Sequence, residues 1–220
     1  TGGIASLQGS KSYSGTTLVN GVSNLWLIDS GTNATFNSTF NISSGSQLRV
    51  GGIPMNAGVA ITIAGDVIGA GDLNLSYGVN SNMPTVKLMG QLLLTGTTNL
   101  TNTTLMLNNS SDYRVTSNLT GSAGAFGKLQ LSGSGNVTIA TNNSGYTGRL
   151  VIDPGASLTI GDGGTNGSLN ISNVYAVVNN GNLSFNRSDN VTFNAPITGS
   201  GALNKFGTNV LTLTANSNLT

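Results

Sequence analysis

A phrase of four or five residues recurs along the chain, in which a small or polar residue precedes strictly alternating apolar, polar and apolar residues. Alternation with a period of two predicts a strand that has one buried side and one solvent-facing side. The copies are clearest in the last third of the chain, at 156–160, 167–171, 181–185 and 190–193, with turn-forming Gly, Asn and Asp between them. Strands this short cannot each bury a core of their own, so we expect them to be stacked units of one larger repeat.

The same phrase also runs through the first two thirds of the chain. Its copies lie at 24–27, 47–50, 59–63, 71–75, 104–107, 127–131 and 135–139. Their spacing is irregular, as a coil with several strands per turn produces and as a simple hairpin meander does not. No window shows the period of an amphipathic helix, and the chain contains no Glu, which is a good helix former.

Two all-β architectures fit this pattern. An immunoglobulin-like sandwich requires fewer, longer strands and several aromatic anchors, whereas this chain has many short strands and 5% aromatic residues. We therefore predict an all-β parallel β-helix, a solenoid in which each strand stacks about 4.8 Å from its counterpart in the previous coil. At roughly 20 to 25 residues per coil, residues 1–220 would form a single solenoid segment of about nine or ten coils.

A longer repeat supports this prediction. Residues 13–21 resemble residues 146–155 in type and nearly in spacing, and residues 211–220 resemble residues 137–147. Because both ends of the sequence break off within the pattern, we expect the chain to be a segment of a longer, exported protein. It carries no signal-peptide pattern of its own.

Composition excludes several classes of protein. Only 7% of residues are charged, against about 25% in an ordinary soluble domain, but 37% are hydrophobic and alternate regularly, unlike a disordered chain. The net charge is +1 with scattered Lys and Arg, which argues against a nucleic-acid surface. The absence of Cys rules out disulfides and thiolate metal sites. No apolar run approaches the roughly 20 residues of a membrane helix, so we expect no membrane insertion by this segment.

Catalysis is not expected. Enzymes with this fold need clustered carboxylates together with a metal or a base, whereas this chain has no His and no Glu. Its acidic residues adjoin Gly, Ser, Asn or Pro and are interpreted as turn residues that bond backbone amides two residues further on. They are Asp29, Asp66, Asp72, Asp112, Asp153, Asp162 and Asp189. We predict no catalytic, cofactor-binding or metal-binding residue.

Two local motifs were weighed against this conclusion. Asp29-Ser30-Gly31 resembles the signature of aspartic proteases, but that chemistry needs two carboxylates and the closest second copy has Pro154 after Asp153. The loop 161–167 resembles a glycine-rich calcium coil, but it occurs once and contains a single Asp, and no Lys follows it as in a phosphate-binding loop. We interpret both as turns.

Asparagines in Asn-x-Ser/Thr triplets are frequent. They include Asn33, Asn37, Asn41, Asn74, Asn99, Asn102, Asn118, Asn136, Asn170, Asn182, Asn190 and Asn218. Period-two alternation in a chain rich in Asn and Thr generates such triplets on the solvent side, although glycosylation of an exported protein remains an alternative. Trp26 and the Tyr residues are expected to pack in the core or in turns, with a sugar-stacking platform as the alternative.

The segment 199–213, GSGALNKFGTNVLTL, resembles the passenger-associated β-strand repeat of Gram-negative autotransporters. The Ser144-Gly145-Tyr146-Thr147-Gly148 turn matches the turn that follows in that family. The resemblance is good over 144–220, recognisable at 13–21 and compositional between them. It implies a right-handed parallel β-helix, the passenger of a protein exported across the outer membrane to the cell surface. Two-partner-secreted adhesins share the coil and are the nearest alternative family.

This resemblance implies a structural and adhesive role without cofactors. Partners would be other copies of the chain, giving cell aggregation, or extracellular glycans or proteins of a host. The alternatives are a passive stalk that carries an upstream functional domain and a polysaccharide-active β-helix enzyme. For the fold itself, we expect ten apolar side chains of the last third to point inward and their Ser, Thr and Asn neighbours to point outward. The ten are Leu158, Ile160, Leu169, Ile171, Leu183, Phe185, Val191, Phe193, Leu211 and Leu213.

Overall fold

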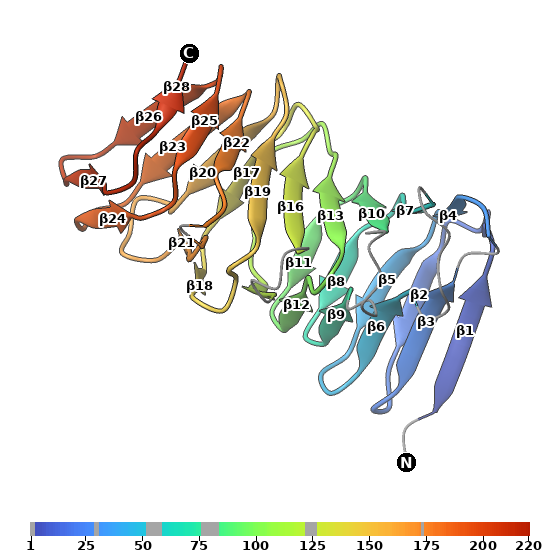
Figure 1. The fold of residues 1–220 in the computed structure, drawn as a ribbon. Coiled ribbons are helices and arrows are strands. Elements are labelled where there is room, and N and C mark those ends of the chain that lie inside the picture. The colour runs from blue at the N-terminus through green and yellow to red at the C-terminus, as the bar shows by residue number, and fades with distance from the viewer. Residues whose placement is uncertain (1–2, 29–30, 52–58, 76–83, 122–126, 173) are drawn as a thin grey trace.

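The computed structural model describes residues 3–28, 31–51, 59–75, 84–121, 127–172 and 174–220. These residues form 28 short strands and no helix, and every strand pairing between them is parallel. Successive coils stack into a solenoid with the two termini at opposite ends (Figure 1). The predicted all-β parallel β-helix is confirmed. Within the described ranges, no helix is long and apolar enough to cross a membrane.

Three faces, which we call A, B and C, run along the solenoid, and the chain visits them in that order in each coil. Thus β3, β4 and β5 lie on faces A, B and C of one coil, and β6, β7 and β8 lie on the same faces of the next. Most strands bond to their counterparts one coil away, so backbone groups of these short strands are satisfied between coils. Among the described strands the ladder is interrupted on face A between β15 and β18 and between β21 and β24, and on face C between β11 and β14.

The strands of each face, in chain order, are as follows. Face A contains β1 (Ile4–Gln8), β3 (Asn24–Ile28), β6 (Gln47–Val50), β9 (Asp72–Asn74), β12 (Thr97–Asn99), β15 (Asn118–Thr120), β18 (Asn142–Asn143), β21 (Ser168–Leu169), β24 (Val191–Phe193) and β27 (Leu211–Leu213). Face B contains β4 (Ala34–Phe36), β7 (Ala60–Ile63), β10 (Thr85–Leu88), β13 (Thr104–Leu107), β16 (Lys128–Leu131), β19 (Arg149–Ile152), β22 (Val177–Asn179), β25 (Ile197–Gly199) and β28 (Asn218–Leu219). Face C contains β2 (Thr16–Val19), β5 (Thr39–Ile42), β8 (Val67–Gly69), β11 (Leu92–Leu94), β14 (Tyr113–Val115), β17 (Asn136–Ile139), β20 (Ser157–Ile160), β23 (Asn182–Asn186) and β26 (Ala202–Phe206).

The coils differ in length. On face B, Val86 pairs with Leu105, a step of 19 residues, whereas Val151 pairs with Val178, a step of 27 residues. The solenoid has about eight turns, slightly fewer than the nine or ten expected. Eight such steps separate the nine strands of face B, from β4 to β28, and the residues before β4 add an incomplete first coil.

An apolar column fills the interior. Seven of the ten side chains that we expected to point inward are buried, and Val191 and Leu211 are partly buried against the core. The prediction is wrong for Leu213, which is 36% exposed. Leu213 lies on β27, which pairs only with β24 in this chain, so one side of it is not covered by another coil. Among the polar neighbours, Ser184 is 7% exposed and therefore not solvent-facing as expected.

The segments that resemble one another in the longer sequence repeat do not lie on the same face of the solenoid. The segment after Tyr13 forms β2 on face C, whereas the segment after Tyr146 forms β19 on face B. Likewise, the similar segments 137–139 and 211–213 lie on faces C and A. All three faces use the same alternation, so similarity between two strands does not establish which face they share.

Glycine permits close stacking of the corners. Gly96 lies directly beside Gly71 of the previous coil, and a Cβ added at Gly96 would be 2.2 Å from the Gly71 carbonyl oxygen. No other residue fits there unless the coils separate, and separation would break the backbone bonds that join them. The high Gly content of the sequence is in this sense a requirement of the fold.

Candidate functional site

The described aspartates are occupied by structural bonds. Oδ1 of Asp66, Asp72 and Asp112 accepts a hydrogen bond from a backbone amide of the next coil, at 2.8, 2.7 and 2.7 Å respectively. The sequence interpretation placed these bonds two residues further on, and this is correct only for Asp162, which accepts from the amide of Gly164 at 3.3 Å. The stacked corner of the next coil presents its amide to the carboxylate and so competes with the local turn.

The other acidic side chains form polar pairs. Asp153 accepts from Nε2 of Gln130 at 2.8 Å. Asp162 is bonded to Arg114, which reaches it from two coils away. Asp189 accepts two bonds from Arg187, at 2.8 and 2.7 Å. These arginine bonds lower the pKa of both Asp162 and Asp189 below the usual range for a carboxyl group.

The loop 161–167 is held by a guanidinium group. Arg187 donates to the carbonyl oxygens of Gly167 and Thr165, at 2.7 and 2.5 Å. A calcium ion would need such oxygens as ligands, and here a fixed positive charge already occupies them. No group of three or more His, Cys, Asp or Glu residues gathers within the described ranges. Asp29 and Ser30, which suggested a protease motif, lie outside those ranges.

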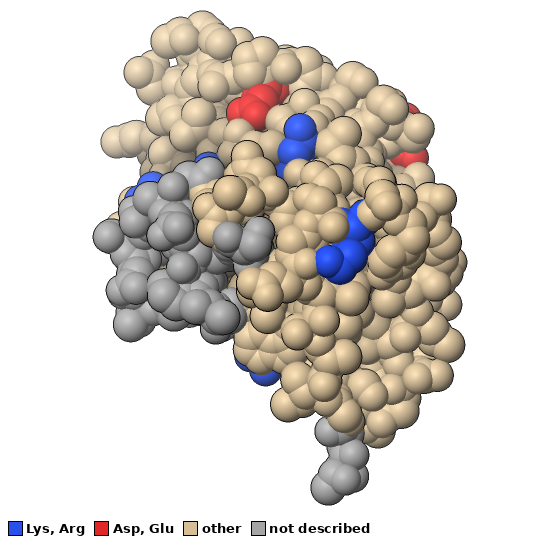
Figure 2. Space-filling view, turned by 90° about the vertical axis from the view of Figure 1, so that its right-hand side faces the viewer, with Lys and Arg blue, Asp and Glu red and all other residues tan. Residues whose placement is uncertain are grey.

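The sequence suggests that Lys and Arg are scattered, but three of them lie on face B of the solenoid. Lys87, Lys128 and Arg149 all project from this face, and Lys128 pairs directly with Arg149 in the neighbouring strand. The Arg149 guanidinium carbon lies 4.8 Å from the ring centroid of Tyr175. Burial is the main cause of a lowered pKa at Lys128; Asp153 acts in the opposite direction. Figure 2 shows basic side chains as separate patches on a largely uncharged surface.

We expected Trp26 to pack in the core or in a turn, and the structure places it in neither. It lies between the buried Leu25 and Leu27 on β3, on the solvent side of face A. The paired residue on β6 is Arg49, whose guanidinium carbon lies 4.5 Å from the centroid of the indole ring. One face of the ring is therefore covered by a cation.

Two of the described tyrosines show the expected core packing, and Tyr77 lies outside the described residues. Tyr113 and Tyr146 are buried, as expected for core packing, and burial raises the pKa of both phenols. Tyr13 is exposed, and its hydroxyl lies 2.8 Å from Oγ1 of Thr17.

The twelve asparagines named above are all at least partly exposed, whereas Asn109, which also begins such a triplet, is buried. Their placement agrees with period-two alternation. Several also bridge coils: Oδ1 of Asn33 accepts from the amide of Ala60, and Oδ1 of Asn190 accepts from the amide of Val210, both at 2.9 Å. Whether any of them is glycosylated stays an open alternative.

The C-terminal half of face C presents a surface of uncharged, mostly polar residues. We use the name polar face for eight residues at outward positions of the alternation on β17, β20, β23 and β26; they are Asn136, Thr138, Ser157, Thr159, Asn182, Ser184, Ala202 and Asn204. Ser184 is the one buried member, and the exposed Phe206 adjoins the set at the end of β26. The eight residues lie in two registered rows, one from Asn136 to Ala202 and one from Thr138 to Asn204. None is charged. Hydrogen bonds connect neighbouring coils within it, such as that from Oγ1 of Thr159 to Oδ1 of Asn136 at 3.0 Å.

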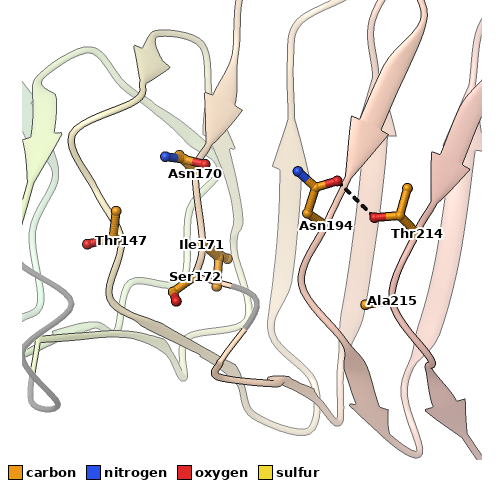
Figure 3. A pocket seen from close by; sticks show the side chains of 7 residues that line it. All are labelled: Thr147, Asn170, Ile171, Ser172, Asn194, Thr214 and Ala215. Atoms are coloured by element: carbon orange, nitrogen blue, oxygen red, sulfur yellow. Dashed lines mark hydrogen bonds between the residues drawn. The ribbon is translucent and has the colours of Figure 1, made fainter.

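A second feature is a groove of about 600 Å³ at the corner between faces A and B, which we call the corner groove (Figure 3). Asn194 and Thr214 lie on one side of the groove (Figure 3). Asn170, Ile171 and Ser172 follow one another along the other side (Figure 3). Thr147 and Ala215 complete the lining. Sequence reasoning did not find this groove, because its residues belong to four different coils and no motif marks them.

Comparison with known proteins found no match among family models, curated proteins or solved structures.

Proposed function

We propose that this chain is a rigid adhesive segment of a protein displayed on the surface of a Gram-negative cell, and that it acts mainly by self-association through the polar face. The observation that supports this proposal is the registered, uncharged surface formed by β17, β20, β23 and β26. Export as an autotransporter passenger belongs to the proposal and rests on the resemblance of residues 199–213 and 144–148 to that family's repeat and turn.

The proposed mechanism is geometric. Stacked coils place hydroxyl and amide groups at a regular spacing of about 4.8 Å, which repeats along the solenoid axis. Each Asn presents a donor and an acceptor, and each Ser or Thr hydroxyl serves as either. A second copy presents the same spacing, so the two polar faces form many hydrogen bonds at once. Each bond contributes only about 1 kcal/mol, and affinity comes from their number and from the multiplicity of copies on a cell.

Two alternatives fit the structure less well. A polysaccharide-active enzyme would need acidic residues converging in a cleft. No acidic residue lines the corner groove, and a second hollow, of about 580 Å³ on face C, is lined by a single acidic residue, Asp112, whose Oδ1 accepts from the amide of Asn136. The other described aspartates are bonded to coil amides, Gln130, Arg114 or Arg187. A passive stalk needs no differentiated surface, whereas the solenoid presents the polar face, a face with three basic residues, and a groove.

Cell aggregation tests the proposal. The chain would be displayed on a bacterium that does not aggregate by itself, and sedimentation of the culture would be followed. We expect rapid sedimentation with the natural sequence and its loss in a double variant, Thr159→Lys with Asn182→Lys, which places like charges on both partners' polar faces.

The matched control carries two lysines on face B, Thr35→Lys with Val178→Lys, both at exposed positions. It should aggregate like the natural sequence. Circular dichroism and surface labelling would establish that all variants are folded and displayed equally. Absence of aggregation at any cell density, or equal aggregation by both double variants, would show that the polar face is not an adhesive surface.

A further inference from the structure

The corner groove arises from a difference in length between successive corner segments. The segment that leads from β21 to β22 comprises the seven residues 170–176, whereas the segment from β24 to β25 in the next coil comprises only residues 194–196. A long corner segment therefore lies beside a short one. Asn170, Ile171 and Ser172 at the start of the long segment form one wall, and the stacked corners at Asn194 and Thr214 form the other (Figure 3).

Amide groups that the protein does not fully use line both walls. On one wall, Nδ2 of Asn170 donates to the carbonyl oxygen of Ser144 at 3.2 Å, and no described residue donates to its Oδ1. On the other wall, Oδ1 of Asn194 accepts from Oγ1 of Thr214 at 2.8 Å, and no described residue accepts from its Nδ2. The groove thus presents an acceptor on one side and two N–H donors on the other.

The charge and polarity of the lining residues indicate which class of ligand the groove would bind. None of the seven lining residues is charged, so an anionic or cationic ligand would find no partner for its charge. Ile171 and Ala215 add apolar surface between the polar groups. Hydroxyl groups that both donate and accept, arranged around a ring with apolar C–H faces, match this lining, and these are the features of a neutral sugar. The volume of about 600 Å³ lies in the usual range for small-molecule sites.

We propose that the corner groove binds a neutral oligosaccharide, with Asn170 and Asn194 bonding its hydroxyl groups from opposite walls. The groove crosses corner segments of four coils, from Thr147 to Thr214. Coils are spaced by about 4.8 Å, so its length suits two or three sugar units. This site extends the proposed adhesive function to a second kind of partner, and it shares no residue with the polar face.

An immobilised panel of neutral, sialylated and sulfated glycans tests the proposal with the purified 220-residue chain. We expect binding to one or more neutral glycans and no preference for the charged ones. In Asn194→Ala the affinity should fall roughly tenfold, because the lost side chain supplies the donors of one wall. In Thr214→Val, which keeps the shape of the side chain but removes the hydroxyl that holds Asn194, a smaller loss is expected.

Asn182→Ala is the matched control, since it removes the same kind of exposed side chain from the polar face and should leave glycan binding unchanged. Thermal unfolding would establish that each variant is folded. Binding to charged glycans only, binding that survives Asn194→Ala, or no binding to any neutral glycan would overturn the proposal. Cells that display the Asn194→Ala variant should still aggregate, because self-association through the polar face does not involve Asn194. A failure of glycan binding is thereby distinguished from a failure of the proposed self-association.

Discussion

The hydroxyl of Tyr146 accepts a hydrogen bond from the backbone amide of Leu129 in the previous coil, at 2.9 Å. It also donates to the carbonyl oxygen of Arg149 at 2.5 Å, and the whole side chain is buried. Gly148 makes this arrangement possible, because a Cβ there would lie 2.5 Å from the carbonyl oxygen of Gly127 and 2.9 Å from the Tyr146 ring. The Tyr-Thr-Gly turn is thus a corner in which the ring fills the core and its hydroxyl satisfies a backbone amide of the previous coil.

Replacing Tyr146 with Phe should lower the free energy of unfolding by about 1 to 3 kcal/mol, because the amide of Leu129 is left buried without a partner. Urea denaturation followed by circular dichroism would measure the loss. Tyr13→Phe is the matched control: that hydroxyl is exposed, and we expect a change within about 0.5 kcal/mol. Equal effects of the two substitutions would contradict the role assigned to the Tyr146 hydroxyl.

Leu183→Ala should destabilise the fold by about 2 to 5 kcal/mol, because it deletes a fully buried side chain from the core. Leu213→Ala makes the same chemical change on the last strand of face A, where the side chain is 36% exposed, and should cost clearly less. Denaturant midpoints of the two variants would be compared with that of the natural sequence. A larger loss for Leu213→Ala would mean that the burial assigned to these positions is wrong.

The fold was predictable because alternation acts locally. Each short strand must bury one side, and a chain of such strands without helices or long hairpins can do so only by stacking. Leu158 and Ile160, for example, are buried, while Ser157 and Thr159, which alternate with them, lie partly exposed, as the pattern requires. The assignment of strands to faces was not predictable, because the alternation of β2 on face C is the same as that of β19 on face B.

The surface was less predictable than the core. Trp26 was expected in the core or in a turn because the chain contains a single Trp, but its position in the alternation between Leu25 and Leu27 placed it outside. The alternation was the stronger signal in this case. The corner groove depends on the relative lengths of two adjacent corner segments, and these lengths become meaningful only after the coils are in register.

The free energy of unfolding should fall at alkaline pH. It should vary little from about pH 5 to pH 8, because the chain contains no His that would titrate in that range. Burial raises the pKa of Tyr113 and Tyr146 in the folded state. Their contribution is therefore fully present below the unfolded value of about 10, and it is lost as the pH rises above that value. Denaturant midpoints measured across pH would show the fall. In Tyr146→Phe the alkaline loss should be smaller, and a steep fall between pH 6 and pH 8 would contradict the assignment.

Self-association should be nearly insensitive to salt. The polar face holds no charged side chain, so screening has no attraction to remove, even at about 1 M salt where the Debye length falls to about 3 Å. Sedimentation of displaying cells would be compared between low and high NaCl. Lys87→Gln with Lys128→Gln removes two cations from face B and should leave both rates unchanged. If salt steeply reduced aggregation, and this double variant removed that salt dependence, charged contacts on face B would carry the adhesion in place of the polar face.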